Sequence, residues 1–314
     1  MQRYEKLRDE LVRKFEEKKV REPESFEQRL NLSWSNWGFG IEDLSVSVKR
    51  LANNNIPYIE LHGNHYGPNL GYKVDQTKAL LDEYGLKVSG VCGMFSDDND
   101  LASNRPIQQE EAIAYIRREV EFTAAMGGDY LLVVPAAVGR PIAYDEFEFF
   151  RSTTALRSVA DIFTEYGVKA AIEPVRGDET TLVHTIAEAK RYIDEVDHPG
   201  VQHINGDVFH MQLGENNIAE AILSAGSSLV NLHLADSNRK ALGSGSMDID
   251  AIIMALYLIN YNTPGHYVTP EPLGGGASPY ASRNGYVSPK DLDALVGDSA
   301  DYFREREAAL TALD

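Results

Sequence analysis

The sequence predicts an α/β fold, a (β/α)8 TIM barrel with an extra N-terminal helix, on three observations. Short apolar runs of strand length alternate with segments of helical periodicity along most of the 314 residues. Each strand–helix unit takes roughly thirty to forty residues, which suits a barrel of this class. Glycines directly follow several helical segments, at Gly85, Gly127 and Gly167, where they would end a helix before the next strand.

The barrel itself is predicted over residues 29–314, and residues 1–28 are predicted to form an amphipathic helix and a lead-in. Within this N-terminal part, Leu7, Leu11 and Phe15 recur at helical spacing among charged residues. Their apolar stripe must pack on the barrel or on another subunit. No linker, low-complexity run or change of composition marks a second domain.

The predicted elements follow one another in a regular alternation. Strands are expected over residues 29–33, 58–62, 87–91, 130–134, 170–173, 201–205, 229–234 and 267–271. Helices are expected between them over residues 41–53, 73–84, 108–126, 145–166, 183–195 and 249–260, with a closing helix over residues 289–310.

The composition disfavours several classes of partner and location. Lys and Arg number 30 against 48 Asp and Glu, which gives a formal net charge of −18. Nucleic acid or an anionic membrane would favour a basic surface, so neither is expected as a partner. No stretch approaches the ~18 apolar residues of a membrane span, and no signal-peptide layout is found. The single cysteine, Cys92, excludes an internal disulfide and fits a cytoplasmic protein.

Four polar residues stand near the ends of the later predicted strands: Glu173, Asp207, His233 and Glu271. The C-terminal strand ends of a barrel converge on one place, where barrel enzymes carry their active sites. Carboxylates gathered there repel one another unless a cation is present, and a divalent metal bound by all four residues would stabilise the set. The sequence therefore predicts a metal-dependent enzyme with these four residues as ligands.

Further polar residues follow the same strand ends. His210 comes three residues after Asp207 and is expected to donate a hydrogen bond to a substrate hydroxyl. Arg239 lies on the next loop, where its guanidinium either holds substrate oxygens or pairs with Asp236 or Asp248.

Two other loop regions contain candidates for substrate contacts. His62 and His65 follow the second predicted strand, and at least one of them is expected to touch substrate. Glycine-rich segments at residues 243–246 and 274–276 follow the last two strands, where barrels frequently bind phosphate. A phosphorylated substrate therefore stays open alongside a free sugar or a glycoside.

The spacing of these residues resembles that of the sugar isomerase/epimerase superfamily, whose members have xylose-isomerase-like barrels. The resemblance is closest to the ketose 3-epimerases, the D-tagatose and D-psicose 3-epimerase group. The positions that match the superfamily's motifs are Glu173-Pro174 with Glu179, Asp207 with His210, His233 with Arg239, and Glu271.

The resemblance implies a metal-dependent epimerase. Mn2+, or else Mg2+ or Co2+, would chelate a ketose through its carbonyl and an adjacent hydroxyl and favour loss of the proton between them. Glu173 and Glu271 would act as base and acid on opposite faces of the sugar, inverting C3 through an enediolate. Glu179, His210 and Arg239 would contact the substrate. Relatives of this kind often form dimers or tetramers, which implies a homo-oligomer.

Other members of the same superfamily provide the alternatives. One is a lyase, either the subunit of a C-glycoside deglycosidase that acts on a 3-oxo sugar with a small β-rich partner chain, or an inosose dehydratase. A true xylose isomerase is disfavoured because its second-metal lysine motif is missing, and an endonuclease is disfavoured by the net charge of −18. A sugar-binding protein without catalysis would not need both Glu173 and Glu271.

Overall fold

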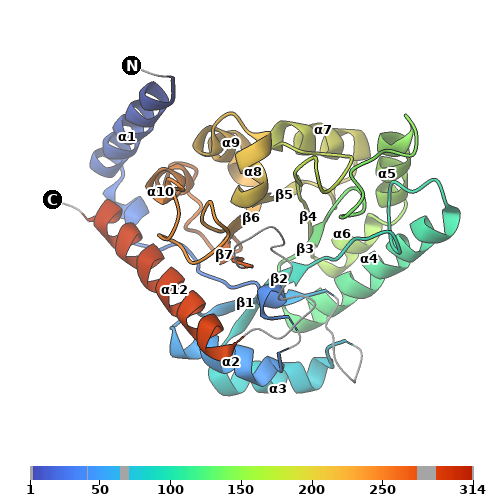
Figure 1. Cartoon of the computed structure of the whole chain (residues 1–314), viewed down its shortest axis with the longest axis horizontal. Coiled ribbons are helices and arrows are strands. Elements are labelled where there is room, and N and C mark those ends of the chain that lie inside the picture. Colours follow the sequence, from blue (N-terminus) through green and yellow to red (C-terminus); the bar gives the residue numbers. More distant parts are fainter. Residues whose placement is uncertain (1–2, 41, 64–70, 274–287, 313–314) are drawn as a thin grey trace.

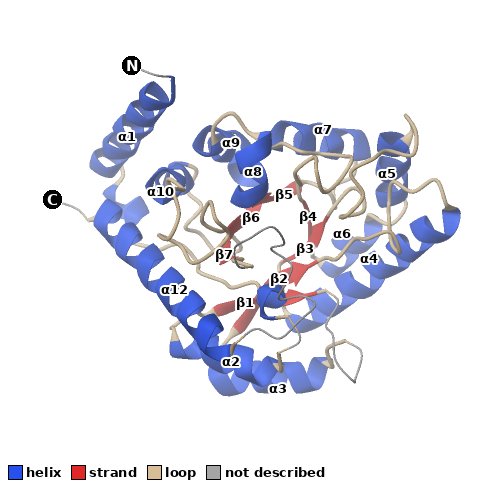
Figure 2. Ribbon diagram, viewed as in Figure 1, coloured by secondary structure: helices blue, strands red, loops and turns tan. Residues whose placement is uncertain are grey.

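Seven parallel strands form the centre of the molecule in the computed structural model, which describes residues 3–40, 42–63, 71–273 and 288–312. Within these residues each strand pairs with the next along the chain, in the order β1 to β7. The strands curve round a central axis with the helices outside them (Figures 1 and 2). They are β1 (Tyr58–His62), β2 (Lys87–Cys92), β3 (Tyr130–Val133), β4 (Lys169–Ile172), β5 (His203–Asp207), β6 (Leu229–Leu234) and β7 (Tyr267–Pro270). The predicted barrel is confirmed.

The segment that precedes β1 closes this barrel between β7 and β1. Leu32 forms an isolated parallel bridge with Val268, and Ser35 forms another with Glu60. The strand predicted over residues 29–33 therefore lies where it was expected, but it forms isolated bridges and not a regular strand. A short 3-10 helix begins at Asn36, so the segment is too short for continuous strand pairing.

Helices connect the strands and form the outer layer. The α-helices are α1 (Arg3–Arg21), α2 (Leu44–Asn53), α3 (Val74–Tyr84), α4 (Pro106–Met126), α5 (Glu148–Arg157), α6 (Asp161–Tyr166), α7 (Ile186–Val196), α8 (Val208–Gly214), α9 (Ile218–Ala225), α10 (Ile249–Leu258) and α12 (Pro289–Thr311). The 3-10 helices are η1 (Pro23–Phe26), η2 (Asn36–Phe39) and η3 (Gly226–Ser228). Gly85, Gly127 and Gly167 adopt left-handed conformations at the ends of α3, α4 and α6, as predicted.

The predicted single helix over residues 145–166 is wrong, since the structure divides it into α5 and α6. The hydroxyl of Ser158 donates a 2.7 Å hydrogen bond to the carbonyl oxygen of Ala155 at the break. Such a side-chain bond competes with the helical ladder and favours a turn.

Two short helices, α8 and α9, were not predicted. The side chain of Asp207 accepts a hydrogen bond from the amide of Phe209 and caps α8, while Asn217 caps α9 through the amide of Glu220. The cap at Asp207 fixes its carboxylate at the strand end, so the same residue ends β5 and starts α8.

The N-terminal helix packs against α10, beside which it lies in Figure 1. Phe15 is completely buried, with its ring edge-on to those of Phe26 and Tyr257. The ammonium group of Lys18 donates a 2.8 Å hydrogen bond to the carbonyl oxygen of Tyr257. The apolar stripe of this helix thus finds its partner on the barrel's own helices.

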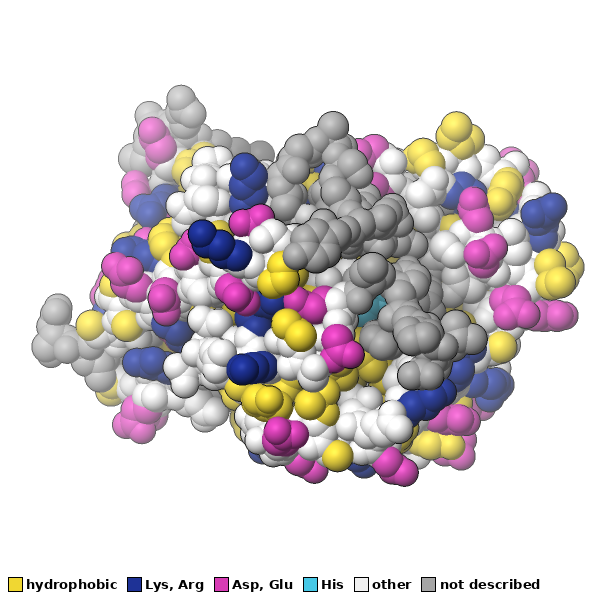
Figure 3. Space-filling model, turned by 60° about the horizontal axis from the view of Figure 1, so that its bottom comes forward, with side chains coloured by type: hydrophobic (Ala, Val, Ile, Leu, Met, Phe, Trp, Pro, Cys, Tyr) yellow, Lys and Arg dark blue, Asp and Glu magenta, His cyan; other side chains and the backbone are white. Residues whose placement is uncertain are grey.

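The space enclosed by the strands contains polar as well as apolar side chains. Glu60, Tyr130, Asn205, Asn231 and Thr269 are all completely buried there and bonded to one another. On the outer surface, acidic and basic side chains are interspersed over the face drawn in Figure 3. No helix among the described residues combines the length and apolar character that crossing a bilayer requires.

Candidate metal centre and active site

Four consecutive strands bring the predicted ligands to the same end of the barrel. Glu173 directly follows β4, Asp207 ends β5, His233 lies in β6, and Glu271 directly follows β7. All four side chains are buried, with no more than 6% of any residue exposed. The parallel register places Asp207 beside His233 across the β5–β6 pair.

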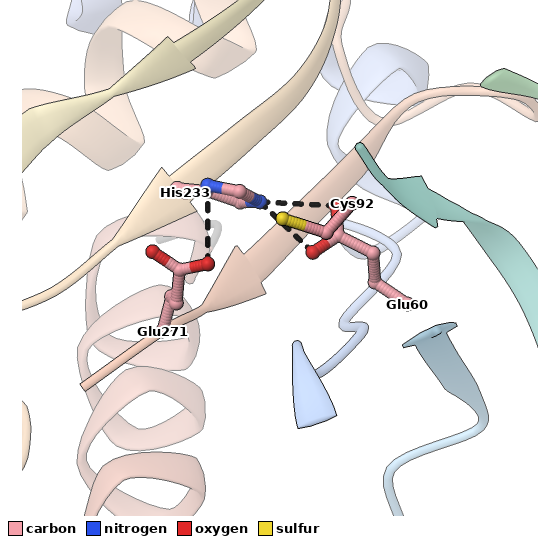
Figure 4. A group of neighbouring side chains, drawn as sticks. All are labelled: Glu60, Cys92, His233 and Glu271. Atoms are coloured by element: carbon pink, nitrogen blue, oxygen red, sulfur yellow. Dashed lines mark hydrogen bonds and ion pairs between the residues drawn. The ribbon is translucent and has the colours of Figure 1, made fainter. Parts of the chain in front are cut away.

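The ligating atoms of these residues fall into two neighbouring groups. Glu271 and His233 lie with Glu60 and Cys92 in one group, which Figure 4 shows, and Glu173 and Asp207 lie with His210 in the other. The ring of His233 joins the groups: its Nδ1 is 3.5 Å from Glu173 Oε1 and 3.6 Å from Glu271 Oε1. These separations are longer than a good hydrogen bond.

Glu60 is a member of this site that the sequence analysis missed. Both oxygens of its carboxylate lie 3.0 Å from His233 Nε2, on the side of the ring away from Nδ1 (Figure 4). Its position in the middle of the apolar run of β1 was a usable signal, because a buried carboxylate requires partners. Cys92 is buried, and burial raises the pKa of its thiol well above the usual value. Hard ions such as Mn2+ and Mg2+ prefer oxygen ligands to sulfur, so Cys92 is a poor candidate ligand.

The charges around the four proposed ligands favour a positive charge between them. Burial opposes a charged imidazole, yet Glu271 and Glu60 raise the pKa of His233 well above its usual value. For Asp207, the cost of burial is outweighed by His210, Arg239 and His233, which lower the pKa of its carboxyl. Burial raises the pKa of Glu271 to about 8, although His233 and Arg239 act in the opposite direction.

The donor set fits a divalent metal. Among the described residues, the four buried carboxylates of the two groups face one guanidinium, that of Arg239. Carboxylate oxygens and an imidazole nitrogen are the ligands that Mn2+ and similar divalent ions take in proteins. A divalent ion would balance the excess of buried negative charge. Beside His233 Nδ1 it would also lie next to the carboxylates of Glu173 and Glu271.

A cavity of about 90 Å³ opens above these groups. Its floor is polar and includes His233, Glu173 and Glu271, while its walls are largely apolar. The wall residues are Trp37, Cys92, Gly93, Met94, Phe95, Ser96, Val134, Val138 and Val175, with Glu179, His210 and Arg239 adding polar groups. A sugar, which has apolar C–H faces and hydroxyl edges, suits this combination.

Of the predicted substrate contacts, Glu179, His210 and Arg239 line the cavity, whereas His62 is buried outside its lining. His65 lies outside the described residues. His210 Nε2 is 3.4 Å from Asp207 Oδ2. Its Nδ1 is buried and has no hydrogen-bond partner among the residues described, so it can bond a ligand in the cavity.

Arg239 reaches the floor of the cavity from the loop after β6. Its Nη2 lies 3.2 Å from Glu271 Oε2, and its guanidinium stacks 4.1 Å over the ring of Phe209. The alternative that Arg239 pairs with Asp236 or Asp248 is wrong. Asp248 instead accepts hydrogen bonds from Arg8 and Tyr4 on α1.

Asp236 shapes the loop that carries Arg239. Its carboxylate accepts hydrogen bonds from the amides of Ser237, Gly243 and Met247 at 2.7, 2.8 and 3.1 Å. The glycine-rich segment at residues 243–246 therefore wraps around an internal carboxylate, and these amides are occupied. That observation removes the support for a phosphate site in this segment, and residues 274–276 lie outside the described residues.

Similarities to known proteins agree with this geometry. The L-ribulose 3-epimerase of Methylomonas sp. (strain DH-1) is 30% identical over 190 residues, which are 60% of this chain and 66% of the relative. The 3-dehydro-D-guloside 4-epimerase of Escherichia coli (strain K12) is 31% identical over 206 residues, which are 62% of this chain and 76% of the relative. The structure of D-allulose 3-epimerase from Methylomonas sp. in complex with D-allulose has a TM-score of 0.75 at 25% identity. That similarity covers 89% of this chain and 98% of that chain.

The alignment spans about two thirds of the Methylomonas relative's own length. Residues 48–295, well over half of the chain, match the family model of the xylose isomerase-like TIM barrel. The barrel, its strand-end carboxylates and these similarities lead to one conclusion: the chain belongs to the xylose isomerase-like TIM barrel family.

Proposed function

We propose that this protein is a metal-dependent sugar epimerase that inverts C3 of a free ketose. The observation that carries the proposal is the set of buried carboxylates at consecutive strand ends around His233, on the floor of a cavity with apolar walls. The similarity to several ketose 3-epimerases and to a sugar 4-epimerase supports the same class of reaction.

The metal would be held by Glu173, Asp207, His233 and Glu271, with Mn2+ as the first choice and Mg2+ or Co2+ as alternatives. When bound, such an ion polarises a substrate carbonyl and so acidifies the neighbouring C–H. The remaining chemistry is assigned to side chains.

Glu173 would remove the proton from C3, because it lies on the cavity floor with its Oε1 fixed by a 2.8 Å hydrogen bond from Asn205 Nδ2. Glu271 would return a proton to the opposite face. Burial raises the pKa of Glu271 to about 8 in the metal-free protein, and this shift toward the protonated form suits the role of the acid. One proton passes from C3 to Glu173 and another from Glu271 to the opposite face, so the carbon is inverted and the sugar keeps its composition. Glu173 is then protonated and Glu271 ionised, and proton exchange with water restores both groups before the next turnover; the reverse reaction exchanges the two roles.

His210, Arg239 and Glu179 would hold the sugar's oxygens. The buried Nδ1 of His210 can donate to a hydroxyl, and the guanidinium of Arg239 can stabilise negative charge as C3 is deprotonated. Because the amides of Gly243, Ser244 and Ser246 all donate hydrogen bonds within the loop, a free sugar is favoured over a phosphorylated one. We also propose a cytoplasmic location, which the single cysteine supports, and a homo-oligomer, which rests on the resemblance to the ketose 3-epimerases alone.

A second candidate is epimerisation at C4 of a 3-oxo glycoside. The Escherichia coli relative, named as a 4-epimerase, supports it with 31% identity over 76% of its length. The same pair of glutamates would serve, since C4 of such a sugar also adjoins a carbonyl. The lyases named above begin with the same proton abstraction and differ in what leaves next.

Proton NMR in D2O of the Mn2+-loaded protein separates these reactions. Fructose, tagatose, psicose and a 3-oxo glucoside are supplied in turn, and the position of deuterium is read. Deuterium at C3 of a ketose together with its epimer is the expected result. Deuterium at C4 of the 3-oxo glucoside would favour the second candidate. Exchange in none of them, with metal bound, would overturn the epimerase and direct the search to a lyase and its β-rich partner.

A further inference from the structure

A hydrogen-bonded network lies inside the barrel, directly beneath the proposed metal centre, and the proposed function draws only on its bond from Asn205 to Glu173. We infer that Glu60 and Tyr130 are positioning residues, which fix the ring of His233 so that Nδ1, and not Nε2, faces the metal. The inference rests on the proposed metal centre and assigns a role to residues that have no contact with the cavity.

Glu60 is surrounded by hydrogen-bond donors although it is completely buried. Its Oε1 accepts from the hydroxyl of Tyr130 at 2.7 Å and from Asn231 Nδ2 at 3.2 Å, and both oxygens lie 3.0 Å from His233 Nε2. An ionised carboxylate only accepts, so the hydrogen of the His233 ring belongs on Nε2. That tautomer leaves the lone pair on Nδ1, the nitrogen that faces Glu173 and Glu271.

Tyr130 can reach Glu60 because the residue that faces its ring on the neighbouring strand is a glycine. Gly90 on β2 lies against the tyrosine ring, and a Cβ at that position would meet three ring atoms at 2.5 to 2.6 Å. Such contacts are too short to tolerate, so residue 90 must be a glycine while the ring lies there. The glycine therefore provides the room for the phenol that orients Glu60.

A second arm of the network reaches the proposed base. Asn231 Nδ2 donates to Asn205 Oδ1 at 2.7 Å, and Asn205 Nδ2 donates to Glu173 Oε1 at 2.8 Å. The hydroxyl of Thr269 donates to Asn231 Oδ1 at 2.6 Å, which fixes the orientation of that amide. The two amide hydrogens of Asn231 are thus shared between Glu60 and Asn205, which links the two arms. The same buried network thus aims a ligand, His233, and a carboxylate, Glu173, at one point.

Groups that orient metal-bound histidines typically change metal affinity by about 10- to 100-fold when they are removed. Glu60→Gln keeps the shape of the side chain but offers one acceptor oxygen where two are used. Tyr130→Phe keeps the ring and removes only the hydroxyl. Tyr261→Phe is the matched control, because its buried hydroxyl donates a 2.7 Å bond to the carbonyl oxygen of Tyr267, away from the metal centre.

The experiment measures the Kd for Mn2+ by electron paramagnetic resonance titration in the wild type and the three variants, with circular dichroism to verify folding. We expect Kd to rise by about 10- to 100-fold in Glu60→Gln, by a smaller factor in Tyr130→Phe, and not in Tyr261→Phe. Nitrogen NMR of the Mg2+-loaded protein should show His233 protonated at Nε2 in the wild type and a mixture of tautomers in Glu60→Gln.

An unchanged Kd and an unchanged tautomer in folded Glu60→Gln and Tyr130→Phe would overturn the inference. If Glu60→Gln does not fold, Tyr130→Phe decides alone. Both readouts are independent of turnover, so a protein that binds Mn2+ in this way but epimerises no sugar would refute the proposed reaction and leave the inference standing. A wild type that binds no metal would refute the metal centre and the inference together.

Discussion

Arg239 and Glu271 form a buried ion pair, with Arg239 Nη2 3.2 Å from Glu271 Oε2. The arginine holds this position from a backbone with a φ of 55°, which non-glycine residues rarely adopt. Two features compensate: Phe209 stacks under the guanidinium, and Asp236 fixes the loop. A strained residue kept in this way at a cavity floor is typical of a functional site.

Replacing either glutamate with glutamine should remove turnover while the fold survives. Gln matches Glu in shape and volume and removes only the ability to take or give a proton, so either variant should fold. We expect kcat to fall by about 10²- to 10⁴-fold or more in Glu173→Gln and in Glu271→Gln. Deuterium exchange at C3 is the measurement. Glu307→Gln, which alters a buried carboxyl held by Arg304 far along α12, should retain turnover; full activity in either site variant would sink the mechanism.

Removing the metal should abolish activity and lower the melting temperature. Without a cation, Glu60, Glu173, Asp207 and Glu271 are crowded in a buried site. A ligand present at a hundred times its Kd stabilises the folded state by about 2.7 kcal/mol, so Mn2+ should raise Tm visibly. Calorimetry and epimerisation assays before and after chelation, and after Mn2+ is restored, test this. Undiminished rates in a sample shown by elemental analysis to be metal-free would contradict it.

The stability of the protein should fall as pH rises from about 4.5 to 7 through the contribution of Glu119 on α4. Burial raises the pKa of this carboxyl from 4.5 to about 7, against the effect of Arg118. A raised acid pKa means that the folded state binds the proton more tightly. The contribution is therefore fully present below the unfolded pKa and is lost as pH rises through the folded pKa.

The substitution Glu119→Gln should remove this pH-dependent loss of stability, because glutamine does not ionise. The variant should be more stable than the wild type at pH 8 by up to about 3 kcal/mol and nearly equal to it at pH 4.5. Urea denaturation at the two pH values gives the difference. An advantage of the same size at both pH values would show that the carboxyl's ionisation is not the cause.

Arg140 should stabilise the rim of the cavity. Its guanidinium donates to Asp100 at 2.8 Å and to Glu148 at 2.6 Å, and all three side chains are buried. Glu148 also accepts a 2.6 Å hydrogen bond from Thr181, so the ion cluster ties the loops after β2, β3 and β4 together. Arg140→Met should cost about 3 to 5 kcal/mol in the free energy of unfolding, because two buried carboxylates lose their partner.

The partly exposed pair of Arg306 with Asp250 is the matched control for this change. Arg306→Met should cost no more than about 1 kcal/mol. Equal losses in the two variants, measured by denaturant titration, would contradict a special role for the buried cluster.

The positions of the strands and the proposed ligands could be predicted because both follow from local pattern. A charged residue directly after an apolar run, as at Glu173 and Glu271, gives the strand end and the polar group together. Glu60 was not predicted as a site residue because it lies in the middle of the strand Tyr58–His62, and only the fold brings it close to His233. The rule that identified Glu173, that a carboxylate in a buried strand needs a partner, would have identified Glu60 as well.

The network below the metal centre could not have been predicted from sequence, since its bonds join strands far apart in the chain. Tyr130 and Glu60 are separated by 70 positions, and Asn231 and Glu60 by 171. The local pattern places Asn205 and Asn231 in predicted strands but does not indicate what their side chains meet. Their role depends on which face of the strand meets the barrel axis.

The barrel has a seam where residues 31–35 stand in for a regular strand. The amide of Ser33 donates to Val268 on one side, and the amide of Glu60 donates to Trp34 on the other. The hydroxyl of Ser35 also bonds Glu271 Oε1 at 3.2 Å. An irregular ladder of this kind opens more readily than the continuous pairs elsewhere in the sheet, so its amides should exchange with solvent deuterium first. Each opening would break the bond from Ser35 to Glu271 and loosen the pairing of Trp34 with Glu60, so local opening of the sheet would be coupled to the position of the proposed acid.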